Sequence, residues 1–134
     1  MEFDSAQPIW LQLTAEFSRR IAVGQWRVGE RIAGVRDLAL ELGVNPNTVQ
    51  RAFGELERDR LVRSERASGR YVTDDAELVD DLRRRLASDA ADDFIRRARG
   101  FGMSPGDAQA LIERRWTHDN DPDAPTRGRG AGGD

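Results

Sequence analysis

Four residues near the middle of the chain carry side chains that can read the edges of nucleic acid bases. They are Asn47, Thr48, Gln50 and Arg51. Asn and Gln amides pair bidentately with adenine, and the Arg guanidinium pairs in the same way with guanine. This is recognition through hydrogen bonds and breaks no covalent bond. It therefore depends on the element that presents these side chains.

Two short amphipathic helices, joined by a tight turn at Gly43, are predicted around these residues. The apolar positions of each helix recur at i, i+3, i+4 and i+7: Val35, Leu38, Ala39 and Leu42 in the first, and Val49, Ala52, Phe53 and Leu56 in the second. Asn45 and Pro46 suit the N-cap and the first position of the second helix. This order is typical of a helix-turn-helix, in which the start of the second helix meets base edges. The alternative is an ordinary helical hairpin whose polar face is only solvated.

A basic β-hairpin is predicted next. Residues 61–65 and 70–72 suit two short strands around a turn that ends at Gly69, where glycine permits a tight bend. Arg63, Arg66 and Arg70 make this hairpin basic. A hairpin of this kind, or wing, contacts the DNA backbone and positions a protein more than it selects a sequence. The alternative is a solvated hairpin that only packs the helices together.

Several short motifs occur together between residues 6 and 73. They are PIWLQ at 8–12, VGER at 28–31, VRDLA at 35–39, GVNPNTV at 43–49, and the Leu56-Glu57 pair that leads to Leu61-Val62. Their combination resembles the GntR family of winged helix-turn-helix transcription regulators, and the length of the chain resembles the YtrA-like branch. The resemblance implies a dimeric repressor that binds a specific DNA sequence, commonly at a transporter operon or its own operon.

The resemblance also implies which residues contact DNA. With the hairpin arginines added, the predicted DNA-binding residues are Arg36, Asn45, Asn47, Thr48, Gln50, Arg51, Arg66, Gly69 and Arg70. Three features depart from the family pattern. Gly34 replaces a stronger Ser cap, Pro46 stands where many members have Arg, and the wing tip places its basic residue after Gly69 instead of before it.

Charge and composition limit the functions open to the chain. The net charge of its 134 residues is −3, but residues 31–72 hold 8 Arg and 6 acidic residues, a local excess of +2. Cys is absent, which excludes disulfides and thiol catalysis, and every basic residue is Arg, which excludes a Lys Schiff base. The only His, His118, lies among aspartates, where a metal site is conceivable but not expected. We expect no enzyme activity and no cofactor.

The chain divides by pattern into three segments. We expect a winged helix-turn-helix domain at 1–75, with a first helix at 8–23 and with Trp26 and Val28 packed on its core. A helical dimerisation element is expected at 76–116 and a disordered tail at 117–134. The predicted fold class is therefore mainly α with a small β-hairpin wing. No apolar stretch of about 18 residues and no export leader is seen, so we expect a cytoplasmic protein that does not enter the membrane.

The two predicted C-terminal helices need a partner, because they are too small to form a core of their own. We expect that partner to be the same element of a second copy, which gives a twofold dimer. The predicted dimerisation residues are Leu82, Leu86, Phe94, Phe101, Leu111, Ile112 and Trp116. The alternative is packing on the chain's own winged domain. A small-molecule effector at the dimer interface, and a winged helix that binds proteins instead of DNA, are further possibilities.

Overall fold

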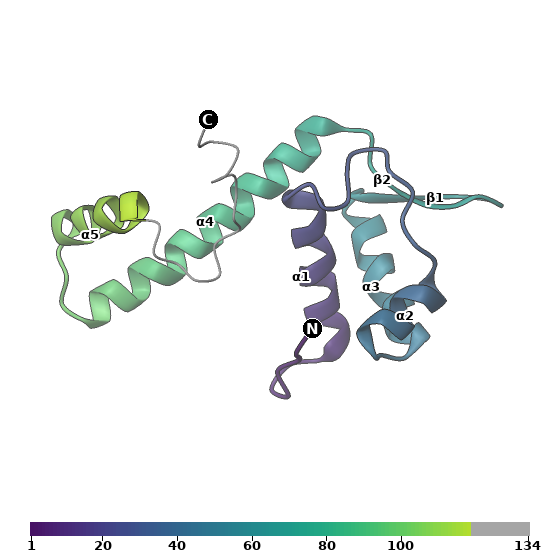
Figure 1. Ribbon diagram of the computed structural model, residues 1–134, viewed down its shortest axis with the longest axis horizontal. Helices are drawn as coiled ribbons and strands as arrows, with labels where there is room; N and C mark the ends of the chain where they lie inside the picture. The colour runs from purple at the N-terminus through teal and green to yellow at the C-terminus, as the bar shows by residue number, and fades with distance from the viewer. Residues whose placement is uncertain (119–134) are drawn as a thin grey trace. The chain divides into compact units, whose positions relative to one another are not determined.

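The computed structural model describes residues 1–118 and has five helices and one antiparallel hairpin in that range. In order, these are α1 (Ile9–Ala22), α2 (Val35–Leu42), α3 (Pro46–Arg58), β1 (Val62–Glu65), β2 (Gly69–Val72), α4 (Ala76–Gly100) and α5 (Pro105–His118) (Figure 1). This confirms the predicted fold class. The chain forms two compact units, one of residues 1–88 and one that begins at Asp89 within α4. Of the predicted tail at 117–134, Thr117 and His118 instead form the end of α5, and residues 119–134 lie outside the described residues.

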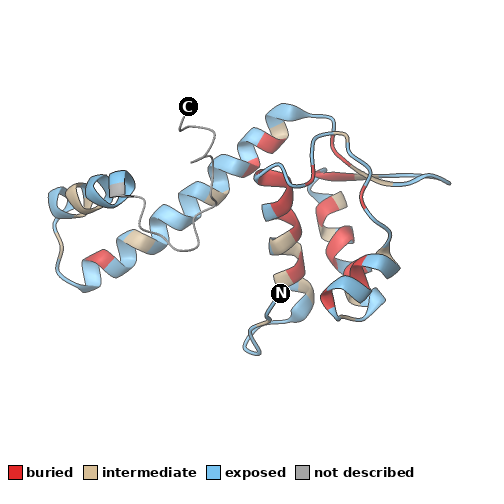
Figure 2. Ribbon diagram, viewed as in Figure 1, coloured by how far each residue is buried: buried red, intermediate tan, exposed pale blue. Residues whose placement is uncertain are grey.

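The core of the first unit lies between α1 and α3, and α2 packs on α3. Figure 2 shows the buried residues on the inward faces of these helices. The Phe17 ring of α1 stacks on the Phe53 ring of α3, with 5.1 Å between the ring centres. The centre of the Trp26 ring lies 5.0 Å from that of Phe17 on another side. Trp26 thus joins the core as predicted. The prediction for Val28 is wrong: its side chain is exposed, because the connection at 23–30 buries only Trp26 and leaves the residues on either side of it in solvent.

Glu16 links two arginines on α1. Its carboxylate accepts hydrogen bonds from Arg19 and Arg20, each at 2.9 Å. Hydrogen bonding to Arg19, helped by that to Arg20, lowers the pKa of Glu16 from 4.5 to about 2 despite partial burial. Arg20 is itself buried, and its guanidinium lies over the Trp26 ring at 5.4 Å. The ion pair therefore holds a charged group against the aromatic core.

The turn between α2 and α3 forms as the sequence predicts. Gly43 has a φ of 68°, the left-handed conformation that glycine adopts without strain. The Asn45 side chain then accepts a hydrogen bond from the backbone N–H of Asn47 at 2.7 Å, and Pro46 takes the first helical position. This short connection fixes the direction in which α3 leaves the turn.

The wing is a hairpin with a third backbone segment beside it. Val62 pairs with Val72 at its base, and Glu65 pairs with Gly69 at its tip. The segment around Arg31 adds to β2, since the Ile32 N–H donates to the Arg70 carbonyl at 2.8 Å. The wing is thereby tied to the connection that precedes α2.

The start of α4 belongs to the first unit. Asp75 caps it by accepting backbone hydrogen bonds from Glu77 and Leu78 at 3.1 and 3.2 Å. Val79 and Leu82 are buried in the same hydrophobic core as the three preceding helices. The first turns of α4 thus complete the winged domain.

The second unit contains the end of α4 and all of α5. α4 ends at a turn where Gly102 has a φ of 78°, and Ser104 then caps α5 by accepting from the Asp107 N–H at 3.1 Å. Large apolar side chains stay exposed here: Phe101 and Trp116 are 84% and 83% exposed. Within residues 1–118, no helix is long and apolar enough to cross a membrane.

Candidate nucleic-acid interface

The second helix of the helix-turn-helix, α3, has one buried and one exposed face. Val49, Phe53 and Leu56 are completely buried against the core. Asn47, Gln50 and Arg51 are exposed, and Thr48 is partly buried beside them. The base-reading side chains predicted from the sequence therefore lie on the solvent side of one helix, near its N-terminal end.

Arg51 is held by a residue from another helix. Its guanidinium lies 4.0 Å from the ring centre of Trp10 in the first turn of α1. A cation over the face of an indole ring is attracted by the negative potential of that face. Arg51 is thus exposed but restrained on one side.

Gln50 is held by the wing. Arg70 of β2 donates from Nη2 to Gln50 Oε1 at 2.8 Å and from Nε to Glu57 Oε2 at 3.2 Å. Glu57 also accepts from the Ser64 hydroxyl on β1. The Arg70 guanidinium lies 5.0 Å from the centre of the Phe53 ring. These contacts connect both strands of the wing to α3.

The tip of the wing is shaped by Gly69 and Arg31. Gly69 has a φ of 118°, and a Cβ atom there would lie 3.1 Å from Arg31 Nε. That Nε donates to the Ser68 carbonyl at 2.7 Å. A side chain at position 69 is therefore disfavoured by both the backbone and the neighbouring guanidinium.

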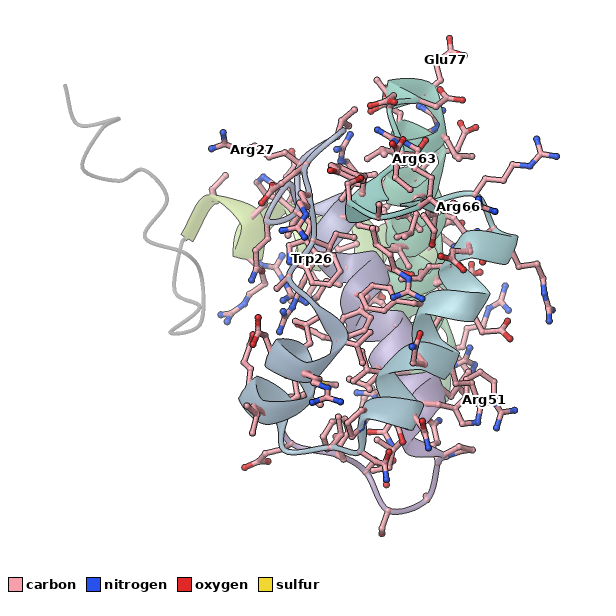
Figure 3. The ribbon with its side chains drawn as sticks, turned by 90° about the vertical axis from the view of Figure 1, so that its right-hand side faces the viewer. Trp26, Arg27, Arg51, Arg63, Arg66 and Glu77 are labelled. Carbon is pink, nitrogen blue, oxygen red and sulfur yellow. The ribbon has the colours of Figure 1, made fainter. Side chains whose placement is uncertain are left out.

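The arginines near α3 and the wing fall into two groups. Arg63 pairs with Glu65 and with Asp74, the latter at 3.2 Å, and Arg70 pairs with Glu57. Within residues 1–118, no carboxylate forms an ion pair with Arg31, Arg36, Arg51 or Arg66. In Figure 3, Arg51 and Arg66 are both drawn on the right-hand side of the view, where α3 is exposed. Within the described residues, these unpaired arginines lie on α3, at the wing tip, in the first turn of α2 and in the connection before α2.

The remaining predicted residues take separate positions. Arg36 is exposed in the first turn of α2, and Asn45 is exposed but uses its side-chain oxygen as the cap of α3. Sequence reasoning missed Trp10, Arg31 and Glu57, which restrain or accompany the predicted residues. All three lie within the motifs of the family pattern, but nothing local indicates what they contact, because each acts on a residue that is distant in the sequence or on another element.

The predicted dimerisation residues differ in exposure. Leu82 is buried in the core of the first unit, and Leu86 packs at the edge of that core. Phe94 and Leu111 are partly buried, whereas Phe101, Ile112 and Trp116 are exposed. Ile112 and Trp116 lie with Gln109 along an open apolar surface of α5. The exposed members of the set are therefore all in the second unit.

Comparison with known proteins places these features in a family context. The family model described as "Bacterial regulatory proteins, gntR family" matches residues 11–72. The uncharacterized HTH-type transcriptional regulator YhcF of Bacillus subtilis is 31% identical over 103 residues, which cover 77% of this chain and 85% of that protein. The HTH-type transcriptional repressor YtrA of the same organism is 33% identical over 75 residues, or 56% of this chain and 58% of that protein. A GntR family transcriptional regulator from Listeria monocytogenes has a similar structure, with a TM-score of 0.78, 30% identity, and coverage of 84% of this chain and 98% of that one.

Proposed function

Because the chain belongs to the GntR family of DNA-binding transcription regulators, we propose that it is a homodimeric repressor that binds a pseudo-palindromic operator. The operator would lie at the promoter of a transporter operon or of the chain's own operon. Repression would be steric, since a dimer on an operator that overlaps the promoter blocks the polymerase. A regulator of this kind acts where the chromosome is, so we propose a cytoplasmic location.

The exposed face of α3 is the observation that carries this proposal. Asn47, Gln50 and Arg51 present amide and guanidinium groups to solvent, while the opposite face of the helix is buried. These groups match the donors and acceptors of bases in the major groove, which is wide enough to admit a helix. Their position at the start of the helix matches the way a helix-turn-helix docks.

The wing and α2 would supply contacts to the DNA backbone. Arg66 at the wing tip and Arg36 in the first turn of α2 are exposed and, within the described residues, have no carboxylate partner. Gly69 allows the backbone of the wing to approach a phosphate closely. Such contacts set the orientation of the protein on the duplex, and the α3 side chains would select the sequence.

The second unit would form the dimer. Phe101 and Trp116 expose most of their surface, and Ile112 adds to the open apolar surface of α5. Burying these side chains against the same element of a second copy would remove apolar area from water at roughly 25 cal/mol per Å². A twofold dimer would present two α3 helices to two half-sites.

The alternative occupant of part of this interface is a small-molecule effector. The apolar surface of α5 is open, so a ligand resting on it needs a second copy of the chain to cover it. Effector binding would therefore depend on dimer formation and could change the spacing between the two α3 helices.

Selection from a random pool of DNA duplexes at about 0.15 M salt, where non-specific binding is screened, tests the proposal. The purified protein is expected to enrich an inverted repeat, and sedimentation is expected to show one dimer on each site. Recovery of duplexes without a common sequence would contradict the operator proposal. It would favour a winged helix that binds other proteins, which in addition predicts that Gln50→Ala has no effect on function.

A further inference from the structure

The wing contacts Gln50 of α3 through one side chain, that of Arg70, and this contact determines which end of the Gln50 amide is free. An Arg guanidinium has only donors, so the Gln50 atom that faces it must be the carbonyl oxygen. The distance from Arg70 Nη2 to that oxygen is 2.8 Å. In a planar amide the NH₂ group lies at the opposite corner. The contact therefore leaves the NH₂ group as the free end of Gln50.

Arg70 is held in this position from three sides. Its Nη2 donates to Gln50, its Nε donates to Glu57, and its guanidinium lies over the Phe53 ring. The Arg70 side chain is therefore only 26% exposed. Gln50 and Glu57 are at positions i and i+7 of α3 and so share one face of that helix, and Phe53, at i+3, is buried beside this face. Arg70 thus lies along this face with its charge already matched by Glu57. Arg66, four residues earlier, is exposed and has no ion-pair partner within residues 1–118.

From these contacts we propose that Arg70 is a positioning residue for base recognition, which orients the Gln50 amide so that its NH₂ group faces the major groove. The proposal rests on the proposed docking of α3 in that groove. It gives Arg70 a different role from the backbone contact that its position in a basic wing suggests. The wing would then take part in choosing the sequence, by way of α3.

The orientation of the amide specifies the type of base that Gln50 reads. Bidentate pairing with adenine needs a donor for N7 and an acceptor for the N6 amino group. With its oxygen turned toward Arg70, the Gln50 amide directs its NH₂ donors, not its acceptor, outward. Guanine presents two neighbouring acceptors, N7 and O6, in the major groove. We therefore expect the base pair read by Gln50 to be G·C, with guanine preferred to adenine.

The test compares duplex selections by the unaltered protein, Gln50→Ala and Arg70→Lys. Gln50→Ala identifies the operator position that Gln50 reads, as the position where preference is lost. Arg70→Lys keeps the charge but lacks the fork that reaches Gln50 and Glu57 together. Preference at that same position is expected to fall about tenfold in Arg70→Lys, within the range of one bidentate contact. An Arg70→Lys protein with the original preference would overturn the proposal, because Lys is an adequate phosphate contact. A preference for adenine at the Gln50 position would also overturn it.

Salt dependence supplies a second, independent readout. Each neutralised phosphate contributes about 0.9 to the slope of log affinity against log salt concentration. Arg66→Ala, the matched control in the same hairpin, is expected to lower the magnitude of the slope by about this amount. Arg70→Ala is expected to leave the slope unchanged while it weakens the preferred operator more than other sequences. Equal weakening of all sequences with a lower slope would make Arg70 a phosphate contact and contradict the proposal.

A double-mutant cycle on the free protein separates this proposal from the operator proposal. Gln50→Ala, Arg70→Ala and the double variant are compared by urea unfolding, without DNA. Coupling of about threefold in the unfolding equilibrium is expected, in the range of a hydrogen bond to a charged group that is partly exposed. Absence of coupling would overturn the positioning role even if the operator is found. Coupling in a protein that selects no sequence would instead contradict the operator proposal.

Discussion

The guanidinium of Arg51 on α3 lies 4.0 Å from the centre of the Trp10 ring on α1, although the two residues are 41 positions apart in the sequence. α1 packs against α3 in the core, and this packing brings the first turn of α1 beside the first turns of α3 (Figure 1). Trp10 restrains a side chain that is otherwise free to adopt many rotamers. Less conformational entropy would then be lost on the base contact that we propose for Arg51.

Replacement of Trp10 by Ala should therefore weaken operator binding through Arg51. We expect a loss of about 0.5–1 kcal/mol for the preferred sequence, the size of an exposed cation–π contact. Non-specific duplexes should bind as before, because the Arg51 charge remains. Competition binding against preferred and scrambled duplexes measures the difference. Trp10→Phe, which keeps a ring, is the control and should recover part of the loss; equal weakening of both duplexes by Trp10→Ala would argue against the restraint.

Gly69→Ala should destabilise the winged domain. The residue has a φ of 118°, and the added Cβ would meet the Arg31 guanidinium at 3.1 Å. Backbone strain of this kind costs on the order of 1–3 kcal/mol. Urea unfolding measures the change in the free energy of unfolding.

Gly54→Ala is the matched control for this substitution. Gly54 is inside α3, and a Cβ added there has nothing within 4 Å. Alanine is favoured over glycine in a helix by about 1 kcal/mol, so this variant should be more stable than the original chain. The two glycine-to-alanine substitutions are thus predicted to change the free energy of unfolding in opposite directions. A loss of stability at both positions would contradict the prediction for Gly54.

The pH dependence of stability should include a contribution from Glu16. Its pKa is lowered from 4.5 to about 2 in the folded protein by hydrogen bonds from Arg19 and Arg20. Between these two values the unfolded state binds more protons, so this stabilisation is complete above pH 4.5 and is lost as the pH falls toward 2. Glu16→Gln should be less stable at pH 7 and should lose less stability over this interval. Denaturant unfolding at pH 7, 4.5 and 2.5 checks this, and parallel pH profiles for the two proteins would contradict it.

Charge placed on the exposed apolar surface of α5 should prevent dimer formation. Trp116→Glu puts a carboxylate at a side chain that is 83% exposed in the single chain and that we propose to be buried between copies. Sedimentation analysis should then show a shift from dimer to monomer, with operator affinity lowered. Leu40→Glu is the control, since Leu40 is equally exposed, at 83%, but lies on α2 in the first unit. A Trp116→Glu protein that remains a dimer would place the interface elsewhere.

Local features of the fold could be read from the sequence because each depends on residues that are close together in the chain. The apolar spacing around Phe53 determined the buried face of α3, and the Asn45-Pro46 pair determined where that helix begins. Gly43 and Gly69 marked the two turns that need a positive φ. For the same reason, the exposed face with Asn47, Gln50 and Arg51 was predictable: once the buried face of a helix is known, its opposite face follows from the helical period.

Only the tertiary structure decided which of these side chains are free and which are already engaged. Arg66 and Arg70 look alike in the sequence, yet Arg70 is paired with Glu57 on α3, and within the described residues Arg66 has no such partner. Trp10 is next to Arg51 only because α1 packs on α3, and Val28 is exposed only because of the path of the chain after α1. The physical reason is that periodicity and capping act within a few residues, whereas ion pairs, ring stacking and burial depend on which distant residues the fold brings within a few ångströms.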